Sequence, residues 1–438
     1  MGSDPEETAA IEALQSLACL THTRAGTDLS RFKKYLKLPG RLGVYEIVGR
    51  ISRMYKVMKV KPKVARKLEL QDHDWCTTDQ ADVLWTSLAY QDTKDLDINS
   101  FSTLIIKDSW LIKDKAAAEA GQSMFRGVSC CFGVPEVLAA YEVKDCRGSL
   151  ITMPRLSPAS LRRNSIDRVL HREIIKTEGK DLREAATVQI LLKAILHAML
   201  GLYSRYLNGW IHGDVNTSSV LLLAQPEMRC VDNLLCLTPE RRQLLGKCIG
   251  MLADDRQCIE EGTLFDTTRE VSEPGMPGTL SFMSIRLLQS LLLPTRTVIT
   301  AIDNLESFIW VLCWTVIEIC LGRRKLNICE EMLRRYLHRT SDIMMMAEDK
   351  KEYTFHLRGT VLPLGPSISS ITPLVEKWFA LAATYRGKVK CLLAGISPSS
   401  DLSQVRHSLH EHCLEAFGKY LEEGFIMLDQ LEDRCIPW

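Results

Sequence analysis

One stretch, residues 210–223, constrains what this chain can fold into more than any other part of the sequence. Before it, residues 184–206 place apolar side chains on a single helical stripe, and an Asn-Gly pair ends that pattern. A His-Gly-Asp tripeptide at 212–214 follows, then a polar loop and an aliphatic run that reads as a buried strand. This order predicts an α+β fold in which a strand holds the Asp214 carboxylate in a cleft. Turns of this composition are also common without any chemistry, so the tripeptide alone leaves a plain loop as the alternative.

The composition narrows the class of protein. The 438 residues fit one large domain with extensions or two domains, and a hydrophobic fraction of 46% is sufficient for a large core. The net charge of +1 argues against general nucleic-acid binding, so no nucleic-acid partner is expected. The 15 cysteines are scattered without metal-ligand spacing and read as the reduced thiols of an intracellular protein. Potential zinc ligands at 407–413 lack a second ligand pair, so a zinc site is not expected either.

The ends and apolar runs of the chain predict a soluble protein. The first seven residues are acidic and polar rather than a secretory signal. The longest apolar run, 308–320, contains Glu318 and is too short to span a bilayer. We therefore expect no transmembrane segment and a cytoplasmic or nuclear location.

Residues 44–58 carry an apolar pattern with helical spacing. Residues 50–67, which overlap them, contain eight Lys or Arg residues and no acidic residue. Together they predict a basic amphipathic helix within a helical N-terminal extension, 1–75, that packs on the domain and leaves its basic face in solvent. A membrane surface, an acidic partner and nuclear import are the alternatives for this face.

Shorter segments carry further candidate functional side chains. Lys107 directly follows a strand pattern at 104–106, and Glu119 lies in a helix-like segment. Residues 250–252 form a short apolar strand that delivers Asp254. No Gly-x-Gly-x-x-Gly sequence precedes the first strands, so a glycine-rich lid over nucleotide phosphates is not evident.

Taken in order, these segments resemble the fungal-type protein kinase family. The matching blocks are Ile106-Lys107-Asp108-Ser109-Trp110, Glu119, the loop 212–219, the segment 250–256, Gly278-Thr279 with Phe282-Met283, Asp303 with Leu305-Glu306-Ser307-Phe308, and Glu376-Lys377-Trp378-Phe379 through Lys390. The blocks run from residue 106 to residue 390, and the resemblance as a whole covers roughly residues 80–395. The resemblance implies a bilobal protein-kinase-like domain over 76–400. Its small β-rich N-lobe would cover 76–155 and its larger, mainly helical C-lobe 156–400, followed by a helical tail at 401–438.

The resemblance also implies a reaction, the transfer of the γ-phosphoryl group of ATP to a protein hydroxyl of the serine/threonine type, with Mg²⁺ in the site. Lys107 resembles the catalytic lysine that binds the nucleotide phosphates, and Glu119 its ion-pair partner. Met153 lies in the segment where a nucleotide-binding hinge is expected. Asp214 resembles the catalytic base and Asp254 the magnesium ligand.

The segment after Asp254 supplies further expectations from the same resemblance. Asp254 is preferred over Asp232 as the magnesium ligand, because its flanking residues match the family better and leave a normal activation-segment length before Gly278. Thr279 resembles the residue beside the peptide-acceptor site of serine/threonine kinases. Asp303 resembles the helix Asp that braces the backbone of the catalytic loop.

Three positions depart from the family pattern. Ser219 stands where a second metal ligand, an Asn, is expected, and its oxygen reaches less far. Ser219 either meets magnesium through water, in which case Ser219→Asn should raise phosphotransfer, or caps its own loop. Gly213 replaces the Arg that reads a phosphorylated activation segment. Arg286 reverses a charge that is normally buried in an ion pair.

These departures keep two other functions open. A pseudokinase that binds nucleotide or protein is favoured by the missing glycine-rich loop and the missing Asn. The joint survival of the four charged site residues Lys107, Glu119, Asp214 and Asp254 opposes it. A small-molecule kinase of the aminoglycoside-phosphotransferase kind also uses His-Gly-Asp, but the blocks that begin at Gly278 and Asp303 argue against it.

Overall fold

The structure of the chain is a computed structural model. It describes residues 52–58, 103–112, 131–143, 150, 168–254, 258–265, 278–293, 298–338, 343–359, 365–396, 401–432 and 438. The chain divides into two compact units. The first unit comprises 1–126 with 136–178, and the second comprises 127–135 with 179–438. The chain therefore enters the second unit briefly before it finishes the first.

The first unit contains a four-stranded antiparallel sheet in the order β1-β2-β4-β3. Its strands are β1 (Ser52–Met58), β2 (Thr103–Ile112), β3 (Val137–Glu142) and β4 (Arg168–Ile175). Along β2 the side chains of Ile105, Lys107 and Ser109 are all buried, as the two-residue period of a strand predicts when one face packs inward. The strand predicted at 104–106 is confirmed within β2.

The helix predicted over 44–58 is wrong for Ser52–Met58, which forms strand β1 and pairs antiparallel with β2. The apolar residues of this short segment fit a strand as well as a helix, and pairing with a neighbouring strand decides between the two. Residues 44–51 and the remaining basic positions of 59–67 lie outside the described residues. The predicted boundaries at 75, 155 and 400 stay predictions.

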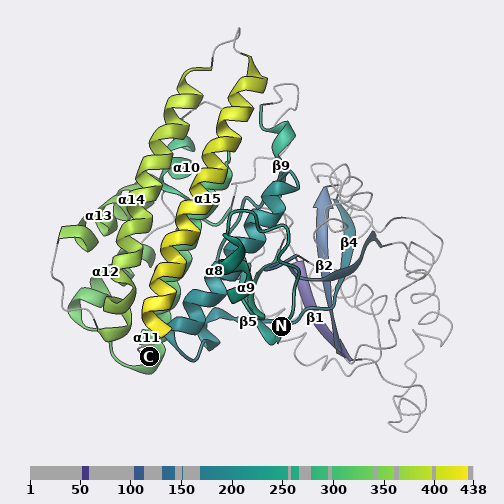
Figure 1. Cartoon of the computed structure of the whole chain (residues 1–438), viewed down its shortest axis with the longest axis horizontal. Helices are drawn as coiled ribbons and strands as arrows, with labels where there is room; N and C mark the ends of the chain where they lie inside the picture. Colours follow the sequence, from purple (N-terminus) through teal and green to yellow (C-terminus); the bar gives the residue numbers. More distant parts are fainter. Residues whose placement is uncertain are drawn as a thin grey trace, which may run out of the picture. The chain divides into compact units, whose positions relative to one another are not determined.

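The second unit is mostly helical. Among its described residues are two small antiparallel sheets, in the orders β5-β7-β8 and β6-β9. Its strands are β5 (Gly179–Asp181), β6 (Trp210–Ile211), β7 (Val220–Glu227), β8 (Cys248–Leu252) and β9 (Ile259–Glu260). Its helices are α8 (Val188–Leu207), α9 (Pro239–Leu244), α10 (Ile285–Ser290), α11 (Ala301–Arg323), α12 (Ile328–His338), α13 (Ile343–Gly359), α14 (Pro366–Ala394) and α15 (Leu402–Glu432), with short 3₁₀ turns η3 (Leu182–Glu184), η5 (Glu261–Thr263) and η6 (Leu280–Phe282). The chain is thus a mixed α+β protein, mostly helical with small antiparallel sheets. Helices α14 and α15 run alongside each other (Figure 1).

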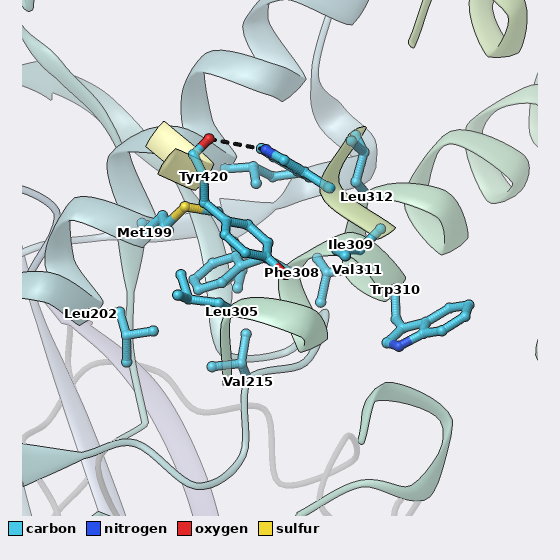
Figure 2. Close-up of a cluster of buried hydrophobic side chains, with 14 of the residues drawn as sticks. Met199, Leu202, Val215, Leu305, Phe308, Ile309, Trp310, Val311, Leu312 and Tyr420 are labelled. Carbon is cyan, nitrogen blue, oxygen red and sulfur yellow. Dashed lines mark hydrogen bonds between the residues drawn. The ribbon is translucent and has the colours of Figure 1, made fainter. Parts of the chain in front are cut away.

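Helices α8 and α11 form the centre of the core. Each begins after a threonine N-cap, Thr187 and Thr300, whose hydroxyl accepts a hydrogen bond from the first turn. Figure 2 shows how their side chains meet other elements: Met199 and Leu202 of α8, Leu305 and Phe308 of α11, Val215 of the loop that follows β6, and Tyr420 of α15. The core therefore reaches directly under the loop that carries Asp214.

The same two helices are long and apolar enough to cross a membrane by length and composition. However, 83% of the most apolar window of α8 and 78% of that of α11 are buried inside the protein. The apolar run at 308–320 is thus part of a longer helix than the sequence indicated, and that helix packs against protein on nearly all sides.

Glycines allow two segments to approach α8 at backbone distance. A Cβ on Gly133, whose φ is +75°, would lie 1.9 Å from the carbonyl oxygen of His197, and one on Gly250 would lie 2.1 Å from that of Ala194. Only glycine leaves room for such contacts. Because the N–H of Leu252 donates to the carbonyl of Gly133 at 2.8 Å, these contacts fix the end of β8, two residues before Asp254.

Beside this contact, His197 of α8 is fully buried and neutral. Its Nδ1 accepts a hydrogen bond from the N–H of Ile249 at 3.0 Å, and its ring meets that of Phe132 edge to face, with 4.7 Å between centroids. Burial, with a smaller effect of the Lys193 charge, lowers the pKa of His197 to about 3. A proton that the unfolded chain binds near pH 6.5 is therefore excluded from the folded chain.

This difference predicts acid sensitivity. Between pH 7.5 and 5.0 the unfolded state takes up a proton at His197 that the native state does not, so the free energy of unfolding should fall by about 2 kcal/mol. His197→Asn keeps an acceptor for the Ile249 N–H and removes the titrating ring. Urea unfolding at the two pH values should show a drop smaller by that amount in the variant. Equal drops in both proteins would contradict the assignment.

Candidate active site

The loop from His212 to Ser219 is held between two strands. Strand β6 leads into it and β7 leads out at Val220. The buried ring of His212 donates from Nε2 to the carbonyl oxygen of Ala253 at 2.8 Å and accepts at Nδ1 from the N–H of Asp214 at 3.3 Å. One imidazole therefore joins the start of the loop to the residue that precedes Asp254.

The Asp214 carboxylate is oriented by its neighbours. Its Oδ1 accepts hydrogen bonds from the N–H of Thr279 at 2.8 Å, from the Thr279 hydroxyl at 2.9 Å and from Nδ2 of Asn216 at 2.9 Å. Gly278 has a φ of +89° and allows the segment that carries Thr279 to approach the loop closely. A Cβ at position 278 would lie 2.9 Å from the carbonyl oxygen of Gly213, so a larger residue would not fit there. Two segments distant in sequence thus meet at Asp214.

Ser219 is built into the loop. Its Oγ accepts from the N–H of Asn216 at 2.9 Å, and its hydroxyl faces the carbonyl oxygens of Asp214 and Asn216, each at 3.1 Å. Only 1% of the residue is exposed. Asn216 Oδ1 is likewise engaged, accepting from Ser218 and from the N–H of Ser219. These bonds correspond to the loop-capping alternative for Ser219, and they favour it over a magnesium contact.

The buried position of Ser219 reverses the expectation for one substitution. Ser219→Asn adds atoms to a filled site and disturbs the bond to the Asn216 N–H, so we expect it to lower the free energy of unfolding by about 1–3 kcal/mol. Phosphotransfer should fall rather than rise. Thermal unfolding and phosphate-transfer rates of this variant, with Ser218→Asn at the exposed neighbouring position as control, check the expectation. A more active and equally stable Ser219→Asn protein would restore the magnesium interpretation.

Asp254 lies directly beside this loop. The N–H of Ala253 donates to the carbonyl oxygen of Ser219 at 2.7 Å, which continues the pairing of β7 with β8. Asp254 itself is half-buried and has a φ of +68°, the only non-glycine residue with positive φ among those the structure describes. Such backbone strain persists where surrounding structure imposes it, often at functional sites. Asp232, in contrast, is exposed in the connection that follows β7, with Cys230 as a side-chain contact.

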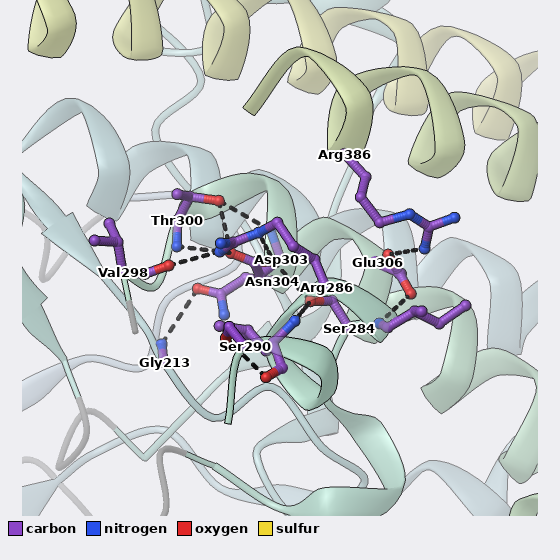
Figure 3. Close-up of polar contacts among 12 residues, drawn as sticks. Gly213, Ser284, Arg286, Ser290, Val298, Thr300, Asp303, Asn304, Glu306 and Arg386 are labelled. Atoms are coloured by element: carbon purple, nitrogen blue, oxygen red, sulfur yellow. Dashed lines mark hydrogen bonds and ion pairs between the residues drawn. The ribbon is translucent and has the colours of Figure 1, made fainter. Parts of the chain in front are cut away.

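The residue that braces the loop 212–219 is not the predicted one, Asp303. The N–H of Gly213 donates to Oδ1 of Asn304 at 3.2 Å, so the amide of Asn304 holds the loop backbone. Asp303 instead closes a capping box with Thr300, accepting from its N–H at 2.9 Å and its hydroxyl at 2.7 Å, and accepts from the Ser284 hydroxyl at 2.6 Å. Figure 3 shows the two adjacent residues serving these different partners. A side chain one position along a helix points about 100° away, which separates them.

The reversed charge at Arg286 is compensated in place. Its guanidinium forms a two-pronged ion pair with the Asp303 carboxylate and donates to the carbonyl oxygen of Val298 at 2.6 Å. Nearby, Glu306 accepts from the N–H of Ile285 at 2.8 Å and pairs with Arg386 of α14 at 3.2 Å (Figure 3). The sequence predicts neither partnership, although Asp303 and Glu306 both lie in a block that resembles the kinase family.

In the first unit, Lys107 is buried and forms an ion pair of 3.0 Å with Glu173. The two residues lie directly opposite each other on β2 and β4. A buried pair of this kind needs good geometry to offset the loss of hydration of both charges. Glu119, the partner predicted for Lys107, and Met153 lie outside the described residues.

In the second unit, Asp254 is the predicted magnesium ligand, and it can be compared with what a bound Mg²⁺ requires. No group of three or more His, Cys, Asp or Glu side chains with metal-binding geometry occurs among the described residues. Mg²⁺ is usually bound by one or two carboxylates together with waters and substrate phosphates, and oxygen donors are the ligands it prefers. The carboxylate of Asp254 fits that requirement, whereas the Ser219 oxygen is already engaged within its loop.

Comparison with known families bears on this geometry. Residues 142–316 match the model of the fungal protein kinase family. Comparison with curated proteins gave no match. The matched span contains Asp214, Asp254, Thr279 and the helix α11 residues that brace the loop, whereas Lys107 precedes it. The resemblance inferred from the sequence is confirmed over this span, where residues 142–316 are similar to the fungal protein kinase family.

Proposed function

We propose that this protein is an ATP-dependent protein phosphotransferase of the serine/threonine type, with a bilobal kinase-like fold. The observation that carries the proposal is the position of Asp214, whose Oδ1 is held by both the N–H and the hydroxyl of Thr279. A carboxylate that two distant segments hold in one orientation, within the span that matches the kinase family, supports the role of a catalytic base. An intracellular location, cytoplasmic or nuclear, belongs to the same proposal because ATP is the phosphoryl donor.

Catalysis would rest on positioning and electrostatics rather than on covalent chemistry. The Asp214 carboxylate accepts the proton of the substrate hydroxyl as that oxygen attacks the γ-phosphorus of ATP, and ADP leaves with the electron pair of the broken bond between the γ-phosphorus and the bridging oxygen. The hydrogen bonds from Thr279 and Asn216 keep the carboxylate in one orientation. Asn304 and His212 hold the backbone of the loop around it. An oriented base contributes roughly 10²–10⁴-fold to the rate of such a proton transfer.

The residues assigned to ATP and magnesium lie in both units. The ammonium of Lys107 is proposed to hold nucleotide phosphates, with Glu173 keeping it in place from the neighbouring strand. Asp254 is proposed to bind Mg²⁺, which, when bound, neutralises the charge that develops on the transferred phosphoryl group. Glu119 and Met153 remain proposed nucleotide contacts of the first unit.

The alternative function is a pseudokinase that binds nucleotide or protein without transfer. One observation favours it: the position expected to supply the second magnesium ligand, Ser219, is buried and used to cap its loop. A single carboxylate for the metal would then support binding better than turnover.

Nucleotide binding and phosphate transfer, measured on the full chain, separate the two functions. A ligand that binds only the folded state raises the free energy of unfolding by about 2.7 kcal/mol at roughly 100 times its Kd. The kinase proposal expects ATP to raise the melting temperature more with Mg²⁺ than without. It also expects labelled phosphate to move from ATP to casein or to the protein itself. Binding that is indifferent to Mg²⁺, without transfer, would establish the pseudokinase.

A further inference from the structure

Lys350 of α13 is a buried cation that the catalytic proposal does not use. Only 1% of the residue is exposed. Its Nζ donates a hydrogen bond to the carbonyl oxygen of Met283 and lies 4.3 Å from the centroid of the Trp310 ring. Burial lowers the pKa of Lys350 to about 7, while the nearby Glu306 charge opposes this shift. Burying a charged side chain costs folding free energy, so the burial of Lys350 needs a structural reason.

Lys350 is not needed to neutralise the charge of Glu306. The Oε1 of Glu306 accepts from the N–H of Ile285 and from Nε1 of Trp310, and its Oε2 pairs with Arg386 at 3.2 Å. Arg386 therefore already supplies the opposite charge. The hydrogen bond of Lys350 is directed instead at the backbone of the segment that touches Asp214.

Met283 ends a single tight turn that begins at Thr279. The carbonyl oxygen of Thr279 accepts from the N–H of Phe282 at 2.9 Å and from that of Met283 at 3.1 Å. At the other end of the turn, the N–H and hydroxyl of Thr279 both hold Asp214. A shift of the Met283 carbonyl is thus transmitted through one turn of backbone to the carboxylate.

We propose that Lys350 is a positioning residue for phosphotransfer, which anchors the turn 279–283 from α13 so that Thr279 fixes the orientation of Asp214. The effect on rate rests on the proposed kinase function. The effect on the turn itself does not. Misplacement of a catalytic group by about 1 Å costs on the order of 10²-fold in rate, so a loosened turn should be visible in kcat.

The test uses the full chain with Lys350→Met, which keeps an unbranched side chain of similar length but removes the charge and the donor. The matched control is Lys351→Met, because Lys351 lies next in sequence and pairs with Glu348 at the surface. Amide hydrogen exchange of the 279–283 turn should rise about tenfold or more in Lys350→Met and stay unchanged in Lys351→Met. Melting curves establish that both variants are folded, and Lys350→Arg serves as a second variant that restores charge and donor.

The kinetic part distinguishes positioning from general stability. In Lys350→Met, kcat should fall about 10²-fold with the KM for ATP nearly unchanged. Combining it with Thr279→Val, which removes the hydroxyl bond to Asp214, should give less than the product of the two losses, since both act through the same turn. Unchanged exchange in a folded Lys350→Met protein, or fully multiplicative losses, would overturn the proposal. If the wild-type chain transfers no phosphate, the kinase function fails, and hydrogen exchange alone still decides whether Lys350 anchors the turn.

Discussion

Asp214→Asn should lower the rate of phosphate transfer by about 10²–10⁴-fold, the range that an oriented general base contributes. Asn occupies almost the same volume, and its carbonyl oxygen still accepts the bonds that Thr279 donates to Oδ1 in the native loop. The amide cannot take a proton from the attacking hydroxyl. The loss should therefore appear in kcat, while the KM for ATP and the melting temperature change little. Initial rates at saturating ATP, with casein as acceptor, measure it.

Asp232→Asn is the matched control for this result. It removes the same charge from an exposed carboxylate in the connection that follows β7, where the side-chain contact is Cys230 rather than the His212 loop. Its rate should stay within about twofold of wild type, because substitutions of exposed residues outside the core and the candidate site have small effects. If both variants lose activity alike, Asp214 has no special role. If neither does, the reaction does not use this carboxylate as its base.

The second large effect is expected at Asp254. Asp254→Asn should abolish the additional thermal stabilisation that Mg²⁺ gives to the ATP complex and reduce kcat by at least about 10²-fold. Asn is the informative substitution because Asp254 has a φ of +68°, and Asn adopts this left-handed conformation more readily than Ala. Because Asp254→Asn removes the carboxylate charge but keeps the left-handed backbone conformation, its effect reports on metal binding and not on backbone strain.

A magnesium titration of the ATP-induced melting shift checks this expectation. Wild type should show a saturable magnesium dependence, Asp232→Asn the same dependence, and Asp254→Asn a flat response. A flat response in Asp232→Asn instead would mean that Asp232, and not Asp254, binds the magnesium ion. Retained magnesium dependence in both would mean that neither is a required ligand.

Elements with a long, consistent pattern can be predicted from the sequence. The stripe at 184–206 corresponds to α8, Val188–Leu207. Periodicity over many residues leaves one interpretation. The seven residues of β1 carry a pattern that favours helix, but so short a segment fits both periods, and only pairing with β2 decides it.

For the candidate site, the sequence places the residue types but not their partners. It identifies Asp214, Asp254 and the block that begins at Asp303, because these occur as local motifs in a fixed order. It cannot tell that Asn304 rather than Asp303 holds Gly213, since that depends on the rotation of α11 against the loop. The pairing of Arg286 with Asp303 depends on the same packing.

What the sequence by itself determined is therefore the order of chemical groups along the chain and several of the helices and strands that carry them. Local hydrogen bonding and side-chain periodicity are properties of neighbouring residues, and they can be read without a fold. Only the tertiary structure decided that Thr279 orients Asp214, that Ser219 caps its loop and that Lys350 reaches Met283. Each of these contacts joins groups whose positions follow from packing, and packing depends on all the segments that share the core.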